Sequence, residues 1–406
     1  MLDASDHRAI GARQDLFHLQ EEAPGSVFWH PRGWALYRLL EEDIRRRILD
    51  DGYEEVRTPQ LLDQSIWQQS GHWESFRAGM FALNDDGGCC ALKPVNCPGH
   101  IQIFKQRVRS YRDMPLRLAE FGSCHRNEPR GALSGLMRLR SFVQDDAHIF
   151  CLEEQAADEV QRFCALFRRA YAAFGLEDFS VKFSTRPAVR AGSDALWGHA
   201  EHMLAEAARR AGLSFEVQPG EGAFYGPKLE FILKDARGRS WQCGTLQVDL
   251  VMPERFGLEV VGLDGGRIRP AMIHRALLGS LERFLGILLE HHNGLLPMWL
   301  APQQVLVATV SQVADYYAGV VGGVLREAGL RVAEDTRAES IARKIADAHQ
   351  HGIGWVCAVG RREVDAGSVS LRDRHGQQRV LPLAEAVRLL KECAQSQTSS
   401  APAAPR

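Results

Sequence analysis

The segment 105–140 combines nine lysine and arginine residues with three acidic residues. Such an excess of positive charge suits a polyanion, although a solvated basic face has the same composition. Within this segment, Arg126 and Glu128 end the stretch LAEFGSCHRNE, which has the character of a strand. Turn-forming residues between Gly131 and Gly135 come next, and the chain returns through RLRSFVQDD. The pattern predicts two strands joined by a turn, with an arginine and a glutamate at the end of the first.

Cysteine and histidine side chains are the other candidates for chemistry, because both bind metal ions. Cys97, His148 and His274 are separated by 51 and 126 residues, so their spacing alone gives no metal signal. Most of the fifteen histidines are expected to be structural, and the same explanation is open for each of these two. The nine cysteines include no C-x-x-C pair, which excludes a zinc ribbon and a thioredoxin-like site.

The elements that must position these residues are strands and helices in irregular alternation. Strand-like patterns occur at 116–126, 138–151, 179–185, 228–235 and 240–251. Several of them are separated by turns rather than by helices, which favours a mainly antiparallel sheet with inserted helices, an α+β fold. Apolar residues at helical spacing predict helices at 32–50, 153–175, 194–212 and 272–292. The last of these is strongly apolar and is expected to lie against the sheet.

The composition changes at LLPMWLAPQQ, residues 295–304. Beyond it, strand and helix patterns alternate as βαβα and end in a helix at 383–394, which predicts a small α/β domain with a partly parallel sheet. We therefore expect a catalytic domain at 1–300 and an α/β domain at 301–394. The Ser/Ala/Pro-rich residues 395–406 are expected to form a disordered tail.

Composition limits the classes of protein to consider. The 406 residues are 45% hydrophobic and 25% charged, which is ordinary globular composition. The formal net charge is −2, so any nucleic acid must be bound by a local patch. No apolar run reaches the roughly 18–20 residues of a membrane span, and the polar start lacks the apolar centre of a signal peptide. An odd number of irregularly spaced cysteines favours the reducing cytoplasm, and no membrane partner is expected.

The sequence lacks a P-loop, a Rossmann glycine turn and a G-x-S-x-G nucleophile elbow. Instead, the unit around Arg126 and Glu128 resembles motif 2 of the class II aminoacyl-tRNA synthetases. Pro59 in GYEEVRTPQLL resembles motif 1, and Arg283 in RPAMIHRALLGSLERF resembles motif 3. The resemblance narrows to the threonyl-tRNA synthetase family through KPVNCPGH, FGSCHRNEP, QDDAHIF, EGAFYGPKLEF, WQCGTLQVD and PAMIHRALLGSLERF. These blocks lie in order across 1–300, and 301–394 resembles the anticodon-binding domain of that family.

This resemblance implies a threonine–tRNA ligase, which activates L-threonine with ATP to threonyl-adenylate and transfers it to the 3′ end of tRNA(Thr). Attack of a carboxylate on the α-phosphate brings two anions together, so that a fixed cation must stabilise the transition state. By the resemblance, Arg126 bridges these two anions, and Arg283 holds the outer phosphates with the help of Arg138. Glu128 accepts a hydrogen bond from the adenine amino group, and Phe142 stacks on the adenine ring. Mg²⁺ is expected to accompany ATP.

The family also places one zinc ion per subunit on residues that match Cys97, His148 and His274. Three protein ligands leave a coordination position open, and the family fills it with the amino group and the β-hydroxyl of threonine. A site that demands a hydroxyl rejects valine strongly, but serine carries the same group. The remaining residues of the implied threonine pocket are Gln144, Asp146 as the partner of the ammonium group, Tyr225, Gln247 and Ser280, with Lys228 and Gln242 close by.

Three further residues match positions that face tRNA in this family. His72, in SGHWESF, matches a catalytic histidine near the acceptor ribose, where an imidazole relays a proton; a structural histidine beside Trp73 is the alternative. Glu363 and Arg372 match positions that contact anticodon bases, and an exposed pair at a strand end is the alternative. The C-terminal segment departs from the family at Ala338, where relatives usually have asparagine, and 349–360 lacks their usual proline-containing turn.

Class II sheets pair across a twofold axis, so we expect a homodimer through motif 1. Many bacterial relatives carry two further N-terminal domains, one of which hydrolyses seryl-tRNA, and we expect the present chain to lack editing in cis. Two other interpretations stay open. One is a specialised copy that resists an inhibitor or passes threonine to another acceptor. The other is a non-catalytic RNA-binding regulator, and the presence of Arg126, Arg283 and all three zinc candidates argues against it.

Overall fold

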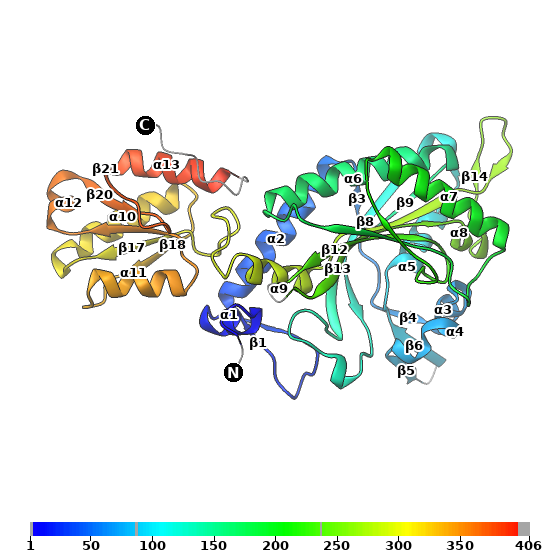
Figure 1. Ribbon diagram of the computed structural model, residues 1–406, viewed down its shortest axis with the longest axis horizontal. Helices are drawn as coiled ribbons and strands as arrows, with labels where there is room; N and C mark the ends of the chain where they lie inside the picture. Colours follow the sequence, from blue (N-terminus) through cyan, green and yellow to red (C-terminus); the bar gives the residue numbers. More distant parts are fainter. Residues whose placement is uncertain (1–2, 86–87, 236–237, 397–406) are drawn as a thin grey trace.

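The computed structural model describes residues 3–85, 88–235 and 238–396 (Figure 1). Its largest sheet has eight strands in the order β11-β10-β12-β13-β16-β9-β8-β3. In chain order the strands are β3 (Glu54–Glu55), β8 (Leu116–His125), β9 (Ser141–Cys151), β10 (Ser180–Ser184), β11 (Glu216–Gln218), β12 (Lys228–Lys234), β13 (Ser240–Asp249) and β16 (Ala271–Ser280). Only the two outermost pairs, β3 with β8 and β10 with β11, run parallel. The predicted, mainly antiparallel α+β fold is therefore confirmed.

Four long helices pack on one face of this sheet and form the largest apolar core with it. They are α2 (Pro31–Asp50), α6 (Ala156–Ala173), α7 (Asp194–Arg210) and α9 (Leu281–His291). Aromatic rings join the layers, as where Phe167 of α6 lies 4.1 Å from Phe231 of β12, between ring centroids. Ile149 and Ile273 belong to this core, whereas their neighbours Phe150 and Met272 belong to a second core on the opposite face. Because side chains alternate along a strand, the two faces carry different residues.

Shorter elements cover parts of that opposite face. The helices are α3 (Gln64–Ser70), α4 (His72–Phe76), α5 (Cys97–Lys105) and α8 (Val251–Arg255). Two three-stranded sheets accompany them, with the strands β4 (Leu61–Asp63), β5 (Ala82–Asp85), β6 (Gly88–Leu92), β7 (Arg109–Ser110), β14 (Val260–Val261) and β15 (Arg267–Ile268). α5 supplies Ile101 and Phe104 to the second core, so this helix is fixed over the sheet by apolar packing.

The helix predicted over 272–292 is wrong in its first half. Residues Ala271–Ser280 form the central strand β16, and only Leu281–His291 form the helix α9. Both faces of β16 are covered, so every residue from Ala271 to Leu278 is buried and the alternation typical of a strand is missing. A buried strand without alternation cannot be distinguished from a buried helix by periodicity. The actual boundary is Ser280, whose side chain accepts a hydrogen bond from the Arg283 N–H and caps α9.

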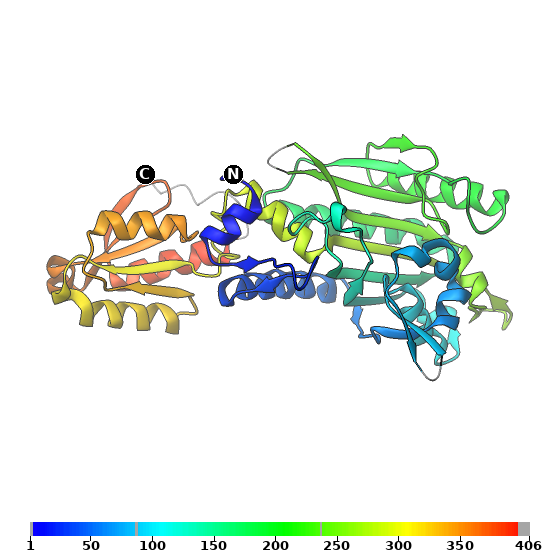
Figure 2. The same cartoon turned by 90° about the horizontal axis from the view of Figure 1, so that it is seen from below.

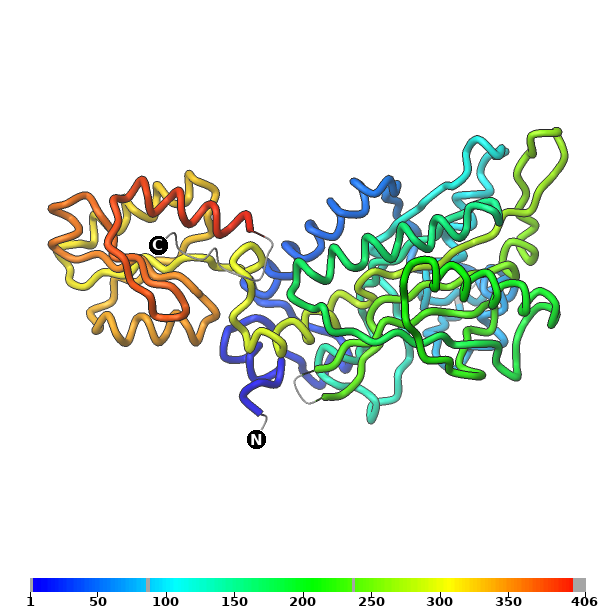
Figure 3. Tube along the Cα trace, turned by 45° about the horizontal axis from the view of Figure 1, so that its top comes forward, coloured from blue at the N-terminus to red at the C-terminus, as the bar shows by residue number. Residues whose placement is uncertain are grey.

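The N-terminal segment begins with helix α1 (His7–Arg13) and the two-stranded sheet of β1 (Phe17–His18) and β2 (Phe28–Trp29). Helix α1 contacts α9, so the start of the chain lies beside the end of the main-sheet region (Figures 2 and 3). Gln14, directly after α1, donates a hydrogen bond to the carbonyl of Gly294, 3.0 Å away. Helix α1 and Gln14 are therefore part of the packed structure, although the polar sequence of this segment did not predict it.

The C-terminal residues form a separate five-stranded sheet with its own cores, in the order β18-β17-β19-β20-β21. Its strands are β17 (Val305–Thr309), β18 (Val332–Asp335), β19 (Trp355–Val359), β20 (Ser368–Arg372) and β21 (Gln378–Pro382). The helices are α10 (Asp315–Glu327), α11 (Ile341–Gln350), α12 (Arg361–Ala366) and α13 (Leu383–Gln395). The first three strands in this order pair in parallel and the last two pairings are antiparallel, as expected for a partly parallel sheet.

Residues 397–406, which make up most of the tail expected at 395–406, lie outside the described residues, and Gln395 is the last residue of α13. Within the part of the chain that the structure describes, no helix combines the length and the apolar character needed to cross a bilayer.

Candidate active site

A cavity of about 300 Å³ opens on the sheet face opposite the four long helices. Strand β9 contributes Phe142, Gln144, Asp146 and His148, which are spaced by two residues and therefore point to the same face. The neighbouring strands continue the pattern, since Gln247 of β13 pairs with His274 of β16, and His274 pairs with His148. The remaining predicted site residues in the lining are Cys97, Arg126, Glu128, Arg138, Tyr225, Ser280 and Arg283. Lys228 and Gln242 line it as well.

Cys97, His148 and His274 meet in the lining of this cavity. All three are buried, and their ligand atoms lie within 4.8 Å of one another. The outer nitrogens of both rings are occupied: His274 Nε2 lies 2.8 Å from Asp249 Oδ2, and His148 Nδ1 lies 2.8 Å from His100 Nδ1. Each ring therefore keeps one nitrogen for the centre of the cluster. A partner of this kind fixes the orientation of a metal-binding histidine.

The electrostatics of the cluster suit a cation. Burial raises the pKa of the Cys97 thiol, with the nearby Asp146 and Asp249 adding to the effect. Burial also lowers the pKa of His148, and the electrostatic effects of His274, His100 and Arg275 lower it further, which favours a neutral imidazole at this position. A soft thiolate and two imidazole nitrogens form a donor set typical of zinc. A cation would compensate the cost of keeping the buried Cys97 as a thiolate.

Polar groups around the cluster are pre-oriented towards a small ligand. Asn96 donates a hydrogen bond of 2.9 Å to Asp146, and burial is the main cause of the raised pKa of that carboxyl group. The Tyr225 ring lies 4.9 Å from the His274 ring, between centroids. Gln247 Oε1 is buried without a hydrogen-bond partner among the described residues. Because such an atom is costly to leave unsatisfied, it is suited to accept a hydrogen bond from a water molecule or a polar ligand in the cavity.

Arginines dominate the other end of the cavity. The Arg126 guanidinium lies 5.1 Å from the centre of the Phe142 ring, and its Nε donates to the carbonyl of Pro94. Arg283 donates from Nε to the carbonyl of Met137 and from Nη1 to the carbonyl of Gln242, both at 2.8 Å. Burial lowers the pKa of Arg283, and the nearby Arg126 and Arg138 lower it further. Several guanidinium groups thus share one cavity. Binding of a polyphosphate would relieve the electrostatic repulsion between them.

Two buried carboxylates that sequence reasoning missed hold these elements in place. Asp145 accepts hydrogen bonds from the backbone N–H groups of Leu277, Leu278 and Gly279, where β16 leaves regular register before Ser280. Glu282 accepts from the Val143 N–H and the Ser280 hydroxyl. The adjacent acids of QDDAH and the glutamate beside Arg283 were visible in the sequence, but alternation along β9 turns Asp145 away from the cavity that Asp146 faces.

His72 is not brought to the cavity lining. It is buried, its Nδ1 lies 2.8 Å from the Ser70 hydroxyl, and its ring packs edge-on against Trp67 and Phe224. Burial, with help from His274, lowers its pKa to about 3 and keeps the ring neutral. The aromatic neighbours differ from the expected Trp73. This geometry resembles that of a structural histidine, hydrogen-bonded and packed behind the cavity lining.

Glu363 and Arg372 line a second cavity of about 410 Å³ in the C-terminal sheet region. Glu363 Oε2 accepts a hydrogen bond from the Gly360 N–H at 2.9 Å. Arg372 Nε has no hydrogen-bond partner among the described residues. Both side chains are half-buried and face a common space rather than standing alone at a strand end. Ala338, in contrast, is exposed in the connection before α11 and lies outside this lining.

Comparison with known proteins finds two family models along the chain. The tRNA synthetase class II core domain (G, H, P, S and T) matches residues 81–292, and the anticodon binding domain matches 304–393. The threonine–tRNA ligase of Rhodospirillum rubrum is 56% identical over 386 residues, which cover 95% of this chain and 60% of that protein. The present chain thus spans about 60% of the length of the curated relatives that it matches.

Two solved structures give the same result over nearly the whole of their chains. The RNA binding domain of threonyl-tRNA synthetase from Cryptosporidium parvum has a TM-score of 0.91 and 38% identity, covering 96% of this chain and 98% of that one. A putative threonyl-tRNA synthetase from Aeropyrum pernix has a TM-score of 0.84 and 30% identity, covering 98% of both chains. On this evidence the chain belongs to the threonyl-tRNA synthetase family, within the class II aminoacyl-tRNA synthetases.

Proposed function

We propose that the chain is an ATP-dependent threonine–tRNA ligase, which forms threonyl-adenylate and then threonylates tRNA(Thr). The observation that carries this proposal is the juxtaposition of two chemically distinct ends in one cavity. Cys97, His148 and His274 form a cation-binding cluster at one end, and Arg126 and Arg283 form an anion-binding cluster at the other. An amino acid and a nucleoside triphosphate would meet between these two clusters.

In the activation step, the threonine carboxylate attacks the α-phosphate, an anhydride bond to phosphorus forms, and pyrophosphate leaves. Arg126 would lie between the two anions, where its fixed charge lowers the repulsion between them. Its packing over Phe142, at 5.1 Å, also brings it next to the ring proposed to stack on adenine. Arg283 and Arg138 would hold the leaving phosphates, with Mg²⁺ bound to ATP, and Glu128 would accept from the adenine amino group.

We propose one zinc ion per subunit on Cys97, His148 and His274, because the donor set and the outward hydrogen bonds of both rings fit that metal. When bound, zinc supplies a Lewis acid that selects ligands with adjacent amino and hydroxyl groups. Asp146, held by Asn96, would pair with the ammonium group of threonine until that ammonium group loses a proton to solvent. The other proposed contacts to threonine are Gln144, Tyr225, Gln247 and Ser280.

For the transfer step we propose that His72 acts indirectly, by supporting Tyr225 in the cavity lining. Its ring centroid lies 6.3 Å from that of Tyr225, and both rings pack on Phe224. Its neutral state suits a proton acceptor, but its burial favours support of Tyr225 over direct contact with the ribose.

The remaining proposals concern the setting of the reaction. We propose that 1–300 is the catalytic domain and that 301–394 binds the anticodon through Glu363 and Arg372, which share one cavity. We also propose a homodimer formed through the region of Pro59, next to β3 at the edge of the main sheet. We propose a cytoplasmic location, because none of the nine cysteines, all of them among the described residues, forms a disulfide.

The test is threonine-dependent ATP–pyrophosphate exchange by the purified chain, run with threonine, serine and valine, with zinc content measured on the same sample. We expect threonine to be used best, serine less well and valine almost not at all, with about one zinc per chain by the ligand count proposed above. Removal of zinc by a chelator should abolish exchange, and added zinc should restore it. Equal use of valine, or full exchange in metal-free protein, would refute the zinc assignment.

A further inference from the structure

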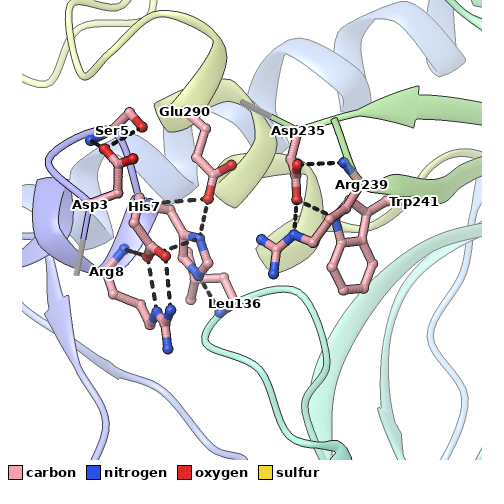
Figure 4. Close-up of polar contacts among 10 residues, drawn as sticks. Asp3, Ser5, His7, Arg8, Leu136, Asp235, Arg239, Trp241 and Glu290 are labelled. Atoms are coloured by element: carbon pink, nitrogen blue, oxygen red, sulfur yellow. Dashed lines mark hydrogen bonds and ion pairs between the residues drawn. The ribbon is translucent and has the colours of Figure 1, made fainter. Parts of the chain in front are cut away.

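Helix α1 is tied to the last turn of α9 by His7. His7 Nδ1 lies 2.7 Å from Glu290 Oε1, and the His7 backbone N–H donates to the same oxygen at 3.2 Å (Figure 4). Both residues are buried. Two segments separated by 283 positions therefore share a buried, charge-assisted contact, which is stronger than an exposed one.

The second nitrogen of His7 binds a different segment. The Leu136 backbone N–H donates to His7 Nε2 at 3.0 Å. Because a backbone N–H can only donate, Nε2 is an acceptor, and the neutral ring must carry its proton on Nδ1, where it donates to Glu290. Asp6 meanwhile accepts two hydrogen bonds from the Arg8 side chain. One possible ligand atom from each of Asp6, His7 and Glu290 lies within 4.8 Å of the other two, but the contacts they make form a hydrogen-bond junction rather than a metal site.

The loop held by His7 continues directly into the proposed ATP site. Leu136 and Met137 line the cavity, and the Met137 carbonyl accepts the 2.8 Å hydrogen bond from Arg283 Nε. Adjacent loop residues thus connect His7 on one side with Arg283 on the other. Helix α9 also connects the two sides, because Arg283 lies in its first turn and Glu290, the partner of His7, lies in its last turn.

Close packing leaves this loop little freedom where it passes His7 and α9. Gly135 has a φ of +51°, and a Cβ atom there would lie 2.1 Å from His7 Nε2. A Cβ atom on Gly286 of α9 would lie 3.2 Å from the Met137 side chain. Glycine is therefore needed at 135 for both the backbone conformation and the approach of the imidazole.

We propose that His7 is a positioning residue for ATP binding. By joining Leu136 to Glu290, it holds the loop at 135–138 against α9, so that Arg283 keeps its orientation towards the cavity before the nucleotide arrives. Preorganisation of this kind lowers the ordering cost that ATP would otherwise have to offset. The inference rests on the proposed function in assigning the arginine end of the cavity to ATP.

The test compares H7F with Q14L in the full chain. Phenylalanine keeps an aromatic ring beside Phe17 but its side chain neither donates nor accepts a hydrogen bond, so it removes both contacts of the imidazole and leaves the backbone N–H contact to Glu290. Gln14 also fixes this segment, through its hydrogen bond to Gly294, but it does not touch the loop at 135–138. Q14L is therefore a matched control for general loosening of the N-terminal segment.

For H7F we expect hydrogen exchange at the Leu136 amide to become about tenfold faster, and the dissociation constant of ATP to rise about tenfold, as for the loss of a buried hydrogen bond. The KM for threonine should change less than twofold, because Cys97 and Asp146 are untouched. H7Q, which can donate and accept at once, should recover most of the ATP affinity. Q14L should leave both ATP binding and Leu136 exchange as in the unmodified chain.

A folded H7F that binds ATP normally, or an equal loss in Q14L, would overturn the proposal. If H7F does not fold, E290Q serves instead: it keeps an acceptor for His7 but removes its charge, so Leu136 exchange and the ATP dissociation constant should rise by a smaller factor. Unchanged values in E290Q would then count against the role of His7. Calorimetric ATP binding and amide exchange need no catalysis, so failure of the proposed ligase activity in the unmodified chain is distinguishable from failure of this inference.

Discussion

The cavity on the main sheet and the cavity in the C-terminal sheet are built in different ways. In the main sheet, the polar groups stand on central strands, and buried partners fix them from behind, as Asp249 fixes His274 and Asn96 fixes Asp146. In the C-terminal sheet, Glu363 and Arg372 are half-buried, and Arg372 Nε has no partner among the described residues. The positions of reacting atoms must be held to a fraction of an ångström, whereas a long nucleic acid can adjust its conformation to the protein surface that binds it. The difference therefore predicts that damage to the first cavity abolishes chemistry and damage to the second weakens binding.

The largest effect is expected from R126A. Its guanidinium is the cation proposed to lie between carboxylate and α-phosphate, and losing one such transition-state donor costs about 10²–10³-fold in rate. Threonine-dependent pyrophosphate exchange should fall by that factor, while the melting temperature stays close to that of the unmodified chain. Exchange within threefold of normal in R126A would contradict the expectation that damage to the first cavity abolishes the chemistry.

The main features of the first cavity could be predicted from sequence because its residues lie within short recognisable blocks. Strand alternation then explains why Gln144, Asp146 and His148 point together. What the sequence could not supply was the distance between blocks. Cys97, His148 and His274 gave no signal by spacing, because their meeting depends on the register of β9 with β16 and on the placement of α5.

Supporting residues were harder to predict than lining residues. His7 and Asp145 contact backbone groups that are remote in sequence, and the buried Glu120 accepts a hydrogen bond from Lys93. Nothing in the local sequence pattern of these three residues separates them from surface residues. The extent of helix α9 was missed for a related reason. Burial on both faces removed the alternation of β16, and only the cap at Ser280 marks where strand becomes helix.

A second prediction concerns the buried network of Glu120, Lys93 and His100, which reaches the Cys97, His148 and His274 cluster through the contact between His100 and His148. Burial alone would raise the pKa of Glu120, but hydrogen bonds from His100, Lys93 and the Thr58 backbone outweigh it and lower the pKa to about 2. The folded pKa lies below the ordinary value of 4.5, so this stabilisation is complete above pH 4.5 and is lost as the pH falls towards 2. The change amounts to at most about 3 kcal/mol.

Urea unfolding of the unmodified chain and of E120Q between pH 5 and pH 3 would measure it. The unmodified chain should lose stability on acidification, and E120Q should start less stable, because Lys93 is left buried beside a neutral amide, and should change less with pH. E339Q, at an exposed position near Ala338, is the matched control and should follow the unmodified chain. Parallel curves for all three proteins would argue that the network contributes nothing to acid stability.

The smallest effect is expected from R372A, at the looser cavity. Loss of one arginine contact to a base costs about 1–3 kcal/mol, so the KM for tRNA(Thr) in threonylation should rise about tenfold or somewhat more. Pyrophosphate exchange without tRNA should stay unchanged, because Arg372 lies in the C-terminal sheet, outside the cavity proposed for ATP and threonine. E363Q removes the charge but keeps a hydrogen-bond acceptor. A rise in the KM for tRNA(Thr) smaller than that of R372A would show that Glu363 contributes as a hydrogen-bond acceptor rather than through its charge. If R372A lowered exchange as well as tRNA binding, the C-terminal sheet would have to influence the chemistry of the first cavity, and the contrast between a rigid catalytic site and an adaptable binding surface would no longer hold.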